Sequence, residues 1–145
     1  MTAREYLEQY REAVRRAERY HEEYRTECIL IDSVRSLSDN DGMPHGTHIS
    51  NPTEEKAIRL ADKALQWKFA ELDAIAIRQE IFETVDCVPG LPGDVLYHRF
   101  VNLRKWEDVC DCVHYSWETV RDAWHEGERI IDEILSARSS NNRLI

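Results

Sequence analysis

Glycine and proline are scarce in this chain of 145 residues, and their placement constrains its fold more than any other feature. Five Gly and four Pro occur, and all except Gly127 lie in two stretches, 42–52 and 89–93. A sheet of many strands needs turn residues at frequent intervals, which the rest of the chain lacks. The distribution therefore predicts an all-α fold of long helices, interrupted at these two stretches.

The first predicted helix runs from Thr2 to about Ile31, where apolar or small residues recur at alternating spacings of three and four. This seam consists of Ala3, Tyr6, Tyr10, Ala13, Ala17, Tyr20, Tyr24 and Ile31, with Leu7, Val14 and Cys28 widening it on one side. The pattern is typical of a helix of several heptads, roughly 45 Å long, whose opposite, charged face lies in solvent.

A second long helix is expected after a polar loop over residues 39–50. Asn51 is suited to cap it, Pro52 to occupy its first position and Glu54 to complete a capping box. Its expected seam is Ile58, Ala61, Leu65, Leu72, Ile75 and Phe82, with Trp67, Phe69 and Ile81 at the edges. Two such seams joined by a loop predict an antiparallel hairpin, because neither helix can bury its stripe alone.

The stretch Val88–Gly93 is expected to end the hairpin, which occupies residues 1–88, and to precede a smaller module at 93–138 and a polar tail at 139–145. Three helices are predicted beyond it, at 94–101, at 106–113 and after a cap at Ser116. Glu107 and Asp108 suit the positive end of the middle helix. The expected buried positions of the outer two helices are Val95, Leu96, Phe100, Leu103, Val120, Trp124, Ile131, Ile134 and Leu135.

Two short helices separated by His114-Tyr115-Ser116 have the proportions of a helix-turn-helix. The residues Trp106-Glu107-Asp108-Val109-Cys110, Val113-His114-Tyr115-Ser116, Val120 and Ile134-Leu135 resemble the sigma factor region 4 type of this motif. The chain is most similar to small bacteriophage proteins of the ArpU and RinA kind, and its start, Met1–Leu7, is similar to the start of relatives of that group. The resemblance covers the C-terminal module well and the hairpin only by pattern.

The resemblance implies a bacteriophage transcription regulator that binds double-stranded DNA at late or packaging genes. Tyr115 and Ser116 would lie at the turn, and Val109, Cys110, Val113 and Val120 would belong to the core. The side chains facing a DNA major groove would be Trp117, Glu118, Arg121, Asp122 and His125, with Arg121 as the strongest candidate for a base or phosphate contact. Arg99, Arg104 and Lys105 would hold the DNA backbone. His114 stands where such modules usually have Gly, and a positive φ there would cost about 1 kcal/mol.

The charge of the chain opposes a simple nucleic-acid interpretation. The net charge is −9, and residues 93–145 contain seven basic and ten acidic residues. Any DNA contact must therefore come from a small local cluster of cations. Two alternatives stay open: an interaction module whose partner is RNA polymerase or another protein, and the small subunit of a phage terminase. A homo-oligomer assembled through the hairpin seams is expected in addition.

Other chemistries are weakly supported. Cys110, Cys112 and His114 invite a zinc hypothesis, but their spacing is narrower than that of structural zinc sites, and no metal or other cofactor is expected. The chain has no Gly-rich phosphate loop, and Cys110 with His114 lacks an orienting third group, so an enzyme is not expected. The start of the chain lacks a secretory signal, and no window approaches 18 apolar residues, which predicts a cytoplasmic protein that does not enter membranes, with four reduced cysteines.

Overall fold

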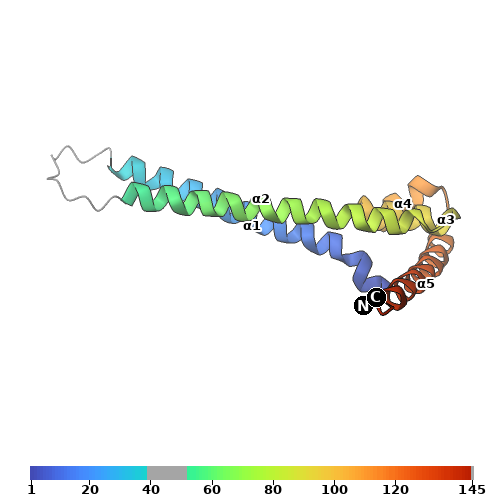
Figure 1. The fold of residues 1–145 in the computed structure, drawn as a ribbon. Helices are drawn as coiled ribbons and strands as arrows, with labels where there is room; N and C mark the ends of the chain where they lie inside the picture. Colours follow the sequence, from blue (N-terminus) through green and yellow to red (C-terminus); the bar gives the residue numbers. More distant parts are fainter. Residues whose placement is uncertain (39–51, 145) are drawn as a thin grey trace. The chain divides into compact units, whose positions relative to one another are not determined.

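The computed structural model describes residues 1–38 and 52–144, and these residues form helices without any strand. The all-α prediction is confirmed. The elements are α1 (Ala3–Ser38), α2 (Pro52–Asp86), α3 (Gly90–Leu96), a π-helical segment η1 (Tyr97–Val101), α4 (Trp106–Val113) and α5 (Trp117–Asn142). The long helices α1 and α2 lie side by side as an antiparallel hairpin (Figure 1). None of the helices in the described ranges is both long and apolar enough to cross a membrane.

The chain divides into two compact units, and both divisions fall inside the long helices. One unit, here called the arm, comprises residues 14–73, and the other, here called the head, comprises residues 1–13 and 74–145. These units divide between residues 13 and 14 and between residues 73 and 74. The domain boundary expected at residues 88–93 stays a prediction. The expected cap Asn51 and the loop at 39–50 lie outside the described residues, whereas α2 does begin at Pro52, as predicted.

The arm is held together by aromatic and small side chains between α1 and α2. The Trp67 ring stacks against His21, with ring centroids 4.2 Å apart, and against Tyr24 at 5.5 Å. Ala17 and Ala70 are small side chains that are buried in the arm. Two ion pairs also connect the helices, Lys63 with Glu23 at 3.4 Å and Arg59 with Glu27 at 3.8 Å. The predicted seam of α1 is confirmed, since its members are buried or half-buried.

The predicted seam of α2 is wrong except at Phe82, which packs against the core of the head. Ile58, Leu65, Leu72 and Ile75 are each at least half exposed, as is Phe69, and Ala61 is exposed as well. The buried face of α2 is instead formed by Trp67 and Ala70 in the arm and by Ala74, Ile77, Ile81, Thr84 and Val85 in the head, with Phe82 half-buried. The error has a physical reason. α2 carries apolar residues on more than one side, so two stripes compete for α1, and the stripe with small alanines beside a stacking tryptophan packs better against a tyrosine-rich helix.

The head has a core to which α1, α2, α3, η1 and α5 all contribute. Its buried members are Ala3, Tyr6, Leu7, Ile81, Val85, Val88, Leu96, Phe100, Val101 and Ile131, so the first turns of α1 are packed together with α5. The Ala3 backbone N–H donates to Asp132 Oδ1 at 2.7 Å. Thr2 and Glu5 form a capping box, in which the Thr2 N–H donates to Glu5 Oε2 at 2.7 Å and the Glu5 N–H donates to Thr2 Oγ1 at 3.3 Å.

The stretch rich in glycine and proline is a tight turn that leads into α3. This helix begins at Gly90, four residues before its predicted start, and Gly90 has a φ of +72°. A Cβ on Gly93 would come within 2.1 Å of the Val88 carbonyl oxygen, so this position requires glycine. At the other end of the module α5 runs to Asn142, so the tail expected from residue 139 is helical up to that residue.

Candidate nucleic-acid interface

The helix-turn-helix candidate has a small core of its own inside the head. Val95 from α3, Val109 from α4, and Val120 and Ala123 from α5 are buried together. Half-buried side chains pack against them: Leu91, Trp106, Cys110, Val113 and Trp124. The core positions predicted for this module, Val109, Cys110, Val113 and Val120, are confirmed. α3, α4 and α5 thus form a three-helix unit around these residues.

The turn between α4 and α5 has a left-handed residue at His114, the position where helix-turn-helix modules of this kind usually have glycine. His114 adopts the left-handed conformation, with φ 60° and ψ 39°, and its N–H donates to the Cys110 carbonyl at 2.9 Å, which ends α4. A residue with a Cβ pays about 1 kcal/mol for this conformation. The histidine therefore accepts strain to keep the turn.

Ser116 occupies the position that caps α5, but not in the way expected. Its backbone is extended, and its carbonyl accepts from the Val120 N–H at 3.0 Å. Its side chain makes no capping hydrogen bond to the helix, and its hydroxyl instead lies 3.3 Å from the Thr119 hydroxyl. The predicted start of the helix is confirmed, and the predicted side-chain cap is wrong, because the hydroxyl is engaged with Thr119.

The side chains predicted to face outward from α5 are exposed: Trp117, Glu118, Arg121, Asp122 and His125. Tyr115, at the turn, is 53% exposed. The Arg121 Nε lies 3.8 Å from Asp122 Oδ1, a weak pair at the surface. His125 stacks on Trp124 at 4.8 Å, and its Nδ1 lies 3.9 Å from Glu128 Oε2. The first turns of α5 therefore offer one cation between carboxylates.

Trp106 is the hub of an aromatic group beneath this surface. Its ring lies 4.7 Å from that of Trp124 and 5.2 Å from that of Trp117. The Arg99 guanidinium covers the Trp106 ring at 4.8 Å, a cation–π contact. Trp117 keeps 43% of its surface exposed, so its indole is both positioned by Trp106 and open to a partner.

The three basic residues predicted to contact the DNA backbone differ in their availability. Arg99 Nη1 donates to the Arg104 carbonyl at 2.8 Å, and burial, reinforced by the nearby Arg11 cation, lowers the pKa of Arg99. The Arg104 guanidinium contacts His98 Nδ1 at 3.1 Å and Cys112 Sγ. Lys105 is the residue that precedes α4, and it is exposed. Lys105 is thus the most accessible of the three, and the two arginines shape the segment that carries it.

His98 supports this arrangement in its neutral form. Burial lowers its pKa, and the neighbouring Arg104 cation lowers the pKa further. A neutral imidazole can accept from Arg104 at Nδ1, whereas a protonated one would repel it. The contact between these two side chains helps to hold the 102–105 segment between η1 and α4.

Three arginines that sequence reasoning did not select also lie at this module. Arg78 Nη2 donates to Asn102 Oδ1 at 3.3 Å, and Arg11 lies close enough to influence the Arg99 pKa. Arg4 pairs with Glu128 at 3.3 Å and covers the Trp124 ring at 5.2 Å. Arg4 and Glu128 are 124 positions apart, so no local pattern could have brought them together.

Carboxylates dominate the rest of the exposed surface of α5. Arg129 bonds to both Glu126 and Glu133, and the hydrogen bond from Arg129 lowers the Glu126 pKa. The Arg129 charge is therefore already compensated. On the outward side of the first turns of α5, two anions, Glu118 and Asp122, stand beside one cation, Arg121.

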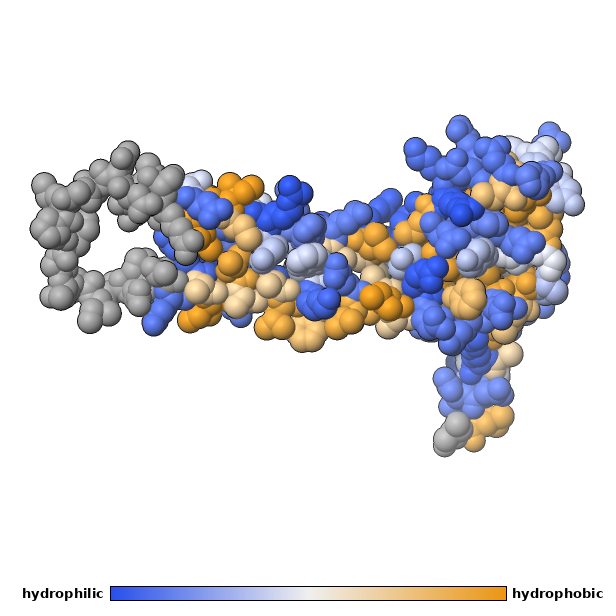
Figure 2. Space-filling view, turned by 90° about the horizontal axis from the view of Figure 1, so that it is seen from above, coloured by the Kyte–Doolittle hydropathy of each residue, from blue (hydrophilic) through white to orange (hydrophobic). Residues whose placement is uncertain are grey.

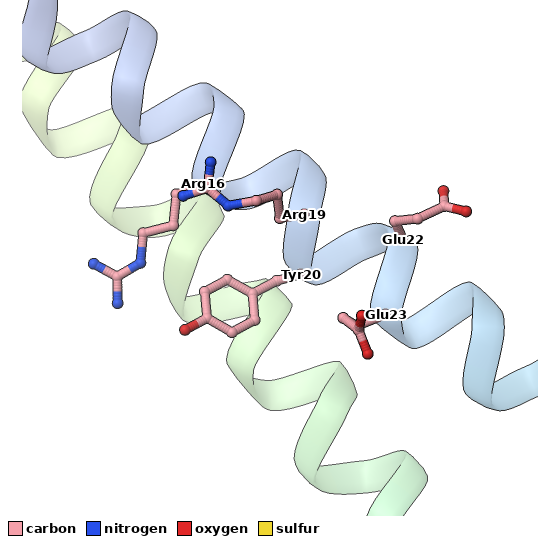
Figure 3. Close-up of a pocket in the computed structure, with 5 residues that line it drawn as sticks. All are labelled: Arg16, Arg19, Tyr20, Glu22 and Glu23. Carbon is pink, nitrogen blue, oxygen red and sulfur yellow. The ribbon is translucent and has the colours of Figure 1, made fainter.

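The arm carries a surface hollow of about 520 Å³ on α1 (Figure 3). All five lining side chains, Arg16, Arg19, Tyr20, Glu22 and Glu23, project from α1. The Arg16 guanidinium lies 5.7 Å from the Tyr20 ring centre, and Glu23 is paired with Lys63. Two cations and two anions on one helix leave no net charge to select a ligand.

The zinc hypothesis finds no support in the part of the chain that the structure describes. No three His, Cys, Asp or Glu side chains of that part are grouped so that they could hold a metal ion. Cys110 packs against the small core, whereas Cys112 is exposed beside Arg104.

No protein-family model matches the chain, and no curated protein and no solved structure matches it either.

Proposed function

We propose that the chain binds double-stranded DNA through the helix-turn-helix of α4, the His114–Ser116 turn and α5. The placement of α5 carries the proposal. Val120 and Ala123 are buried on one side of its first turns, while Arg121 and Asp122 are exposed on the other. In helix-turn-helix proteins, N-terminal residues of the second helix contact base edges in the major groove.

The exposed residues have distinct expected roles. Arg121 is the candidate for a bidentate contact with guanine, and Lys105 is the candidate for a phosphate contact that fixes the register. Tyr115, exposed at the turn, is suited to donate its hydroxyl to a phosphate oxygen. Arg99 and Arg104 act through the protein, because their guanidinium groups already contact Trp106, His98 and Cys112.

The resemblance to sigma factor region 4 and to phage proteins of the ArpU and RinA kind extends the proposal. It implies a bacteriophage regulator of late or packaging genes. This extension is supported only by the resemblance of residues 106–120 and 134–135. DNA binding itself is supported by the arrangement of α4 and α5 as well.

A second function has one specific observation in its favour. Glu118 and Asp122 lie on the same exposed side of α5 as Arg121, and such a face suits a basic protein surface better than a phosphate backbone. RNA polymerase is the partner of this kind that the resemblance implies. In this second function the module would bind protein through the surface proposed above for DNA.

One measurement separates the two functions. Duplexes with a randomised centre are enriched on the full chain, and the enriched duplex is then titrated by fluorescence anisotropy at about 50 and 200 mM salt. DNA binding predicts that affinity falls steeply with salt. It also predicts a loss of about ten- to a hundredfold in Arg121→Ala, the range expected when one good base contact is removed. Arg25→Ala, which removes an exposed arginine of the arm, is the matched control and should bind normally.

The double variant Glu118→Gln/Asp122→Asn gives opposite results in the two cases. It should bind DNA more tightly, because two carboxylates leave the groove, and it should bind purified RNA polymerase more weakly if that is the true partner. Failure of both the natural chain and this variant to bind any duplex at the lower salt concentration would refute the DNA proposal.

A further inference from the structure

We propose that a second copy of the chain docks on the outer face of α2, with the two α2 helices parallel and in register. The docking surface, here called the outer stripe, consists of five residues of the arm: Ile58, Ala61, Leu65, Phe69 and Leu72. Figure 2 shows hydrophobic side chains gathered along the edge of the hairpin. The inference does not depend on DNA binding.

The inner faces of the hairpin are not available for this purpose. Ala17 and Ala70 are buried against the opposite helix, and Trp67 is stacked on His21 and Tyr24. The seam of α1, which sequence reasoning assigned to oligomerisation, is therefore used within one chain. The outer stripe is the apolar face of α2 that the hairpin leaves uncovered.

The amount of exposed apolar surface fits a helix pair. Ile58 and Phe69 are each 62% exposed, Leu65 is 53% exposed and Leu72 is 50% exposed. At roughly 100 Å² for each side chain, two copies of the stripe bring together on the order of 800 Å² of apolar surface. Ala61, the fifth member of the stripe, adds to this area, as do the aliphatic stems of Arg59 and Lys68 at the margins of the stripe. The total contact area then exceeds the roughly 1,000 Å² that a specific interface needs.

The spacing of the stripe indicates that its occupant is another helix. Ile58, Leu65 and Leu72 recur at intervals of seven, with Phe69 four residues after Leu65. A repeat of seven keeps side chains in contact along the full length of a second helix that winds gently around the first. A second copy of the chain has the same sequence, so its α2 carries the same repeat of seven and can pack against the first along its length.

Charges at the margins favour the parallel arrangement. With Ile58, Leu65 and Leu72 at the d positions of the heptad, Lys68 falls at a g position and Asp73 at the following e position. In a parallel pair, g of one helix faces the following e of the other, so Lys68 meets Asp73 of the second copy twice by symmetry. Within the chain Lys68 pairs with Glu71 at the surface, at 3.9 Å, which leaves it free to turn toward a second helix. An antiparallel pair would not place Lys68 opposite Asp73.

A shallow hollow beside the stripe extends the contact surface toward α1. It measures about 360 Å³ and is lined mainly by apolar atoms from Tyr24, Ala64, Leu65, Trp67, Lys68 and Glu71. Leu65 and Lys68 belong both to this hollow and to the stripe or its margin. Side chains of the second copy can therefore pack beyond the stripe itself, between the two helices of the arm.

Sedimentation velocity on the full chain over a hundredfold range of concentration tests the proposal. The natural chain should form a dimer at micromolar concentration, and Leu65→Glu should raise its dissociation constant at least tenfold, because a carboxylate would enter the apolar seam. Leu30→Glu is the matched control, since Leu30 on α1 is 54% exposed and lies outside the stripe. Both variants alter exposed positions, and circular dichroism confirms that they remain helical. A monomeric natural chain, or equal effects of the two variants, would overturn the proposal and leave the stripe for a different helical partner.

Cysteine cross-linking tests the orientation. Leu72→Cys should form a disulfide that joins position 72 of one copy to position 72 of the other, because parallel helices place equal positions opposite each other. Peptide mass spectrometry identifies the linked peptides. A cross-link that appears only when Leu72→Cys is mixed with Ile58→Cys would establish an antiparallel pair and overturn the arrangement proposed here. Asp62 falls at the a position equivalent to Phe69 and would face its counterpart across a parallel pair, so Asp62→Leu should lower the dissociation constant severalfold.

Discussion

The hydroxyl of Tyr6 on α1 lies 2.8 Å from the hydroxyl of Thr84 on α2, in the buried core of the head. Thr84 also donates to the Glu80 carbonyl at 3.1 Å and accepts from Arg138 of α5 at 2.9 Å. Tyr6→Phe should therefore destabilise the chain by about 1 kcal/mol, the usual contribution of one hydrogen bond. The cost stays this small because Thr84 keeps its bonds to Glu80 and Arg138. Urea denaturation followed by circular dichroism measures the change.

Thr84→Val should cost more than Tyr6→Phe, about 2 kcal/mol, because it removes the Thr84 acceptor from the Arg138 guanidinium and leaves the Tyr6 hydroxyl only the longer bond to the Glu80 carbonyl, at 3.4 Å. The double variant should cost less than the sum of the two single losses, since in Thr84→Val the Tyr6 hydroxyl keeps only the longer bond to the Glu80 carbonyl, at 3.4 Å. Additive losses would show that Tyr6 and Thr84 stabilise the head independently.

Gly127 lies against Leu96, and a Cβ on Gly127 would come within 2.8 Å of Leu96 Cδ1. Leu96 is fully buried in the core of the head, so a shift of its side chain would disturb that core. Gly127→Ala should thus destabilise the chain by about 1 kcal/mol, although alanine favours helices, because overpacking outweighs helix propensity. In a Leu96→Ala background the sign should reverse, and Gly127→Ala should then stabilise by up to about 1 kcal/mol. Thermal and urea unfolding of the four proteins give the complete cycle.

The buried face of a helix could be predicted from the sequence where the helix has only one apolar stripe. α1 has a single apolar seam, which packs as expected, and Val109 and Val120 are core residues of the module as predicted. α2 has two apolar stripes, and periodicity cannot decide which of them α1 covers. That choice depends on the fit of Trp67 and Ala70 to the tyrosines of the other helix.

Contacts between distant parts of the chain explain the other differences. In the sequence Gly127 stands out only as the glycine outside the two stretches rich in glycine and proline, whereas its neighbour Leu96 is the reason for the glycine. Arg99 carries the right charge for a phosphate contact, but its position over Trp106 was not visible from spacing. The exposed side of α5 was correctly predicted because one helix defines it.

His114 holds a left-handed conformation that glycine adopts without a steric penalty. His114→Gly should therefore stabilise the chain by about 0.5 to 1 kcal/mol, despite the greater freedom of glycine in the unfolded state. His114→Ala, which keeps the Cβ, should give no such gain. A shift of the urea midpoint in the glycine variant alone is the expected result, and equal midpoints in the two variants would show that the turn carries no strain.

The capping box at the start of α1 predicts a pH dependence. Hydrogen bonds from the Thr2 backbone and side chain lower the pKa of Glu5, so the folded state favours the ionised carboxylate. Its stabilising contribution is complete above the ordinary glutamate pKa of 4.5 and is lost as the pH falls through the lowered value of the folded chain. Glu5→Ala should accordingly be less stable than the natural chain at pH 7, and the difference should shrink on acidification below pH 4.5. Glu5→Gln keeps an acceptor that does not titrate, so its stability relative to Glu5→Ala should stay constant over the same range. Urea denaturation at a series of pH values measures both differences, and a difference between the natural chain and Glu5→Ala that persists at low pH would show that the ionised carboxylate is not what stabilises this end of α1.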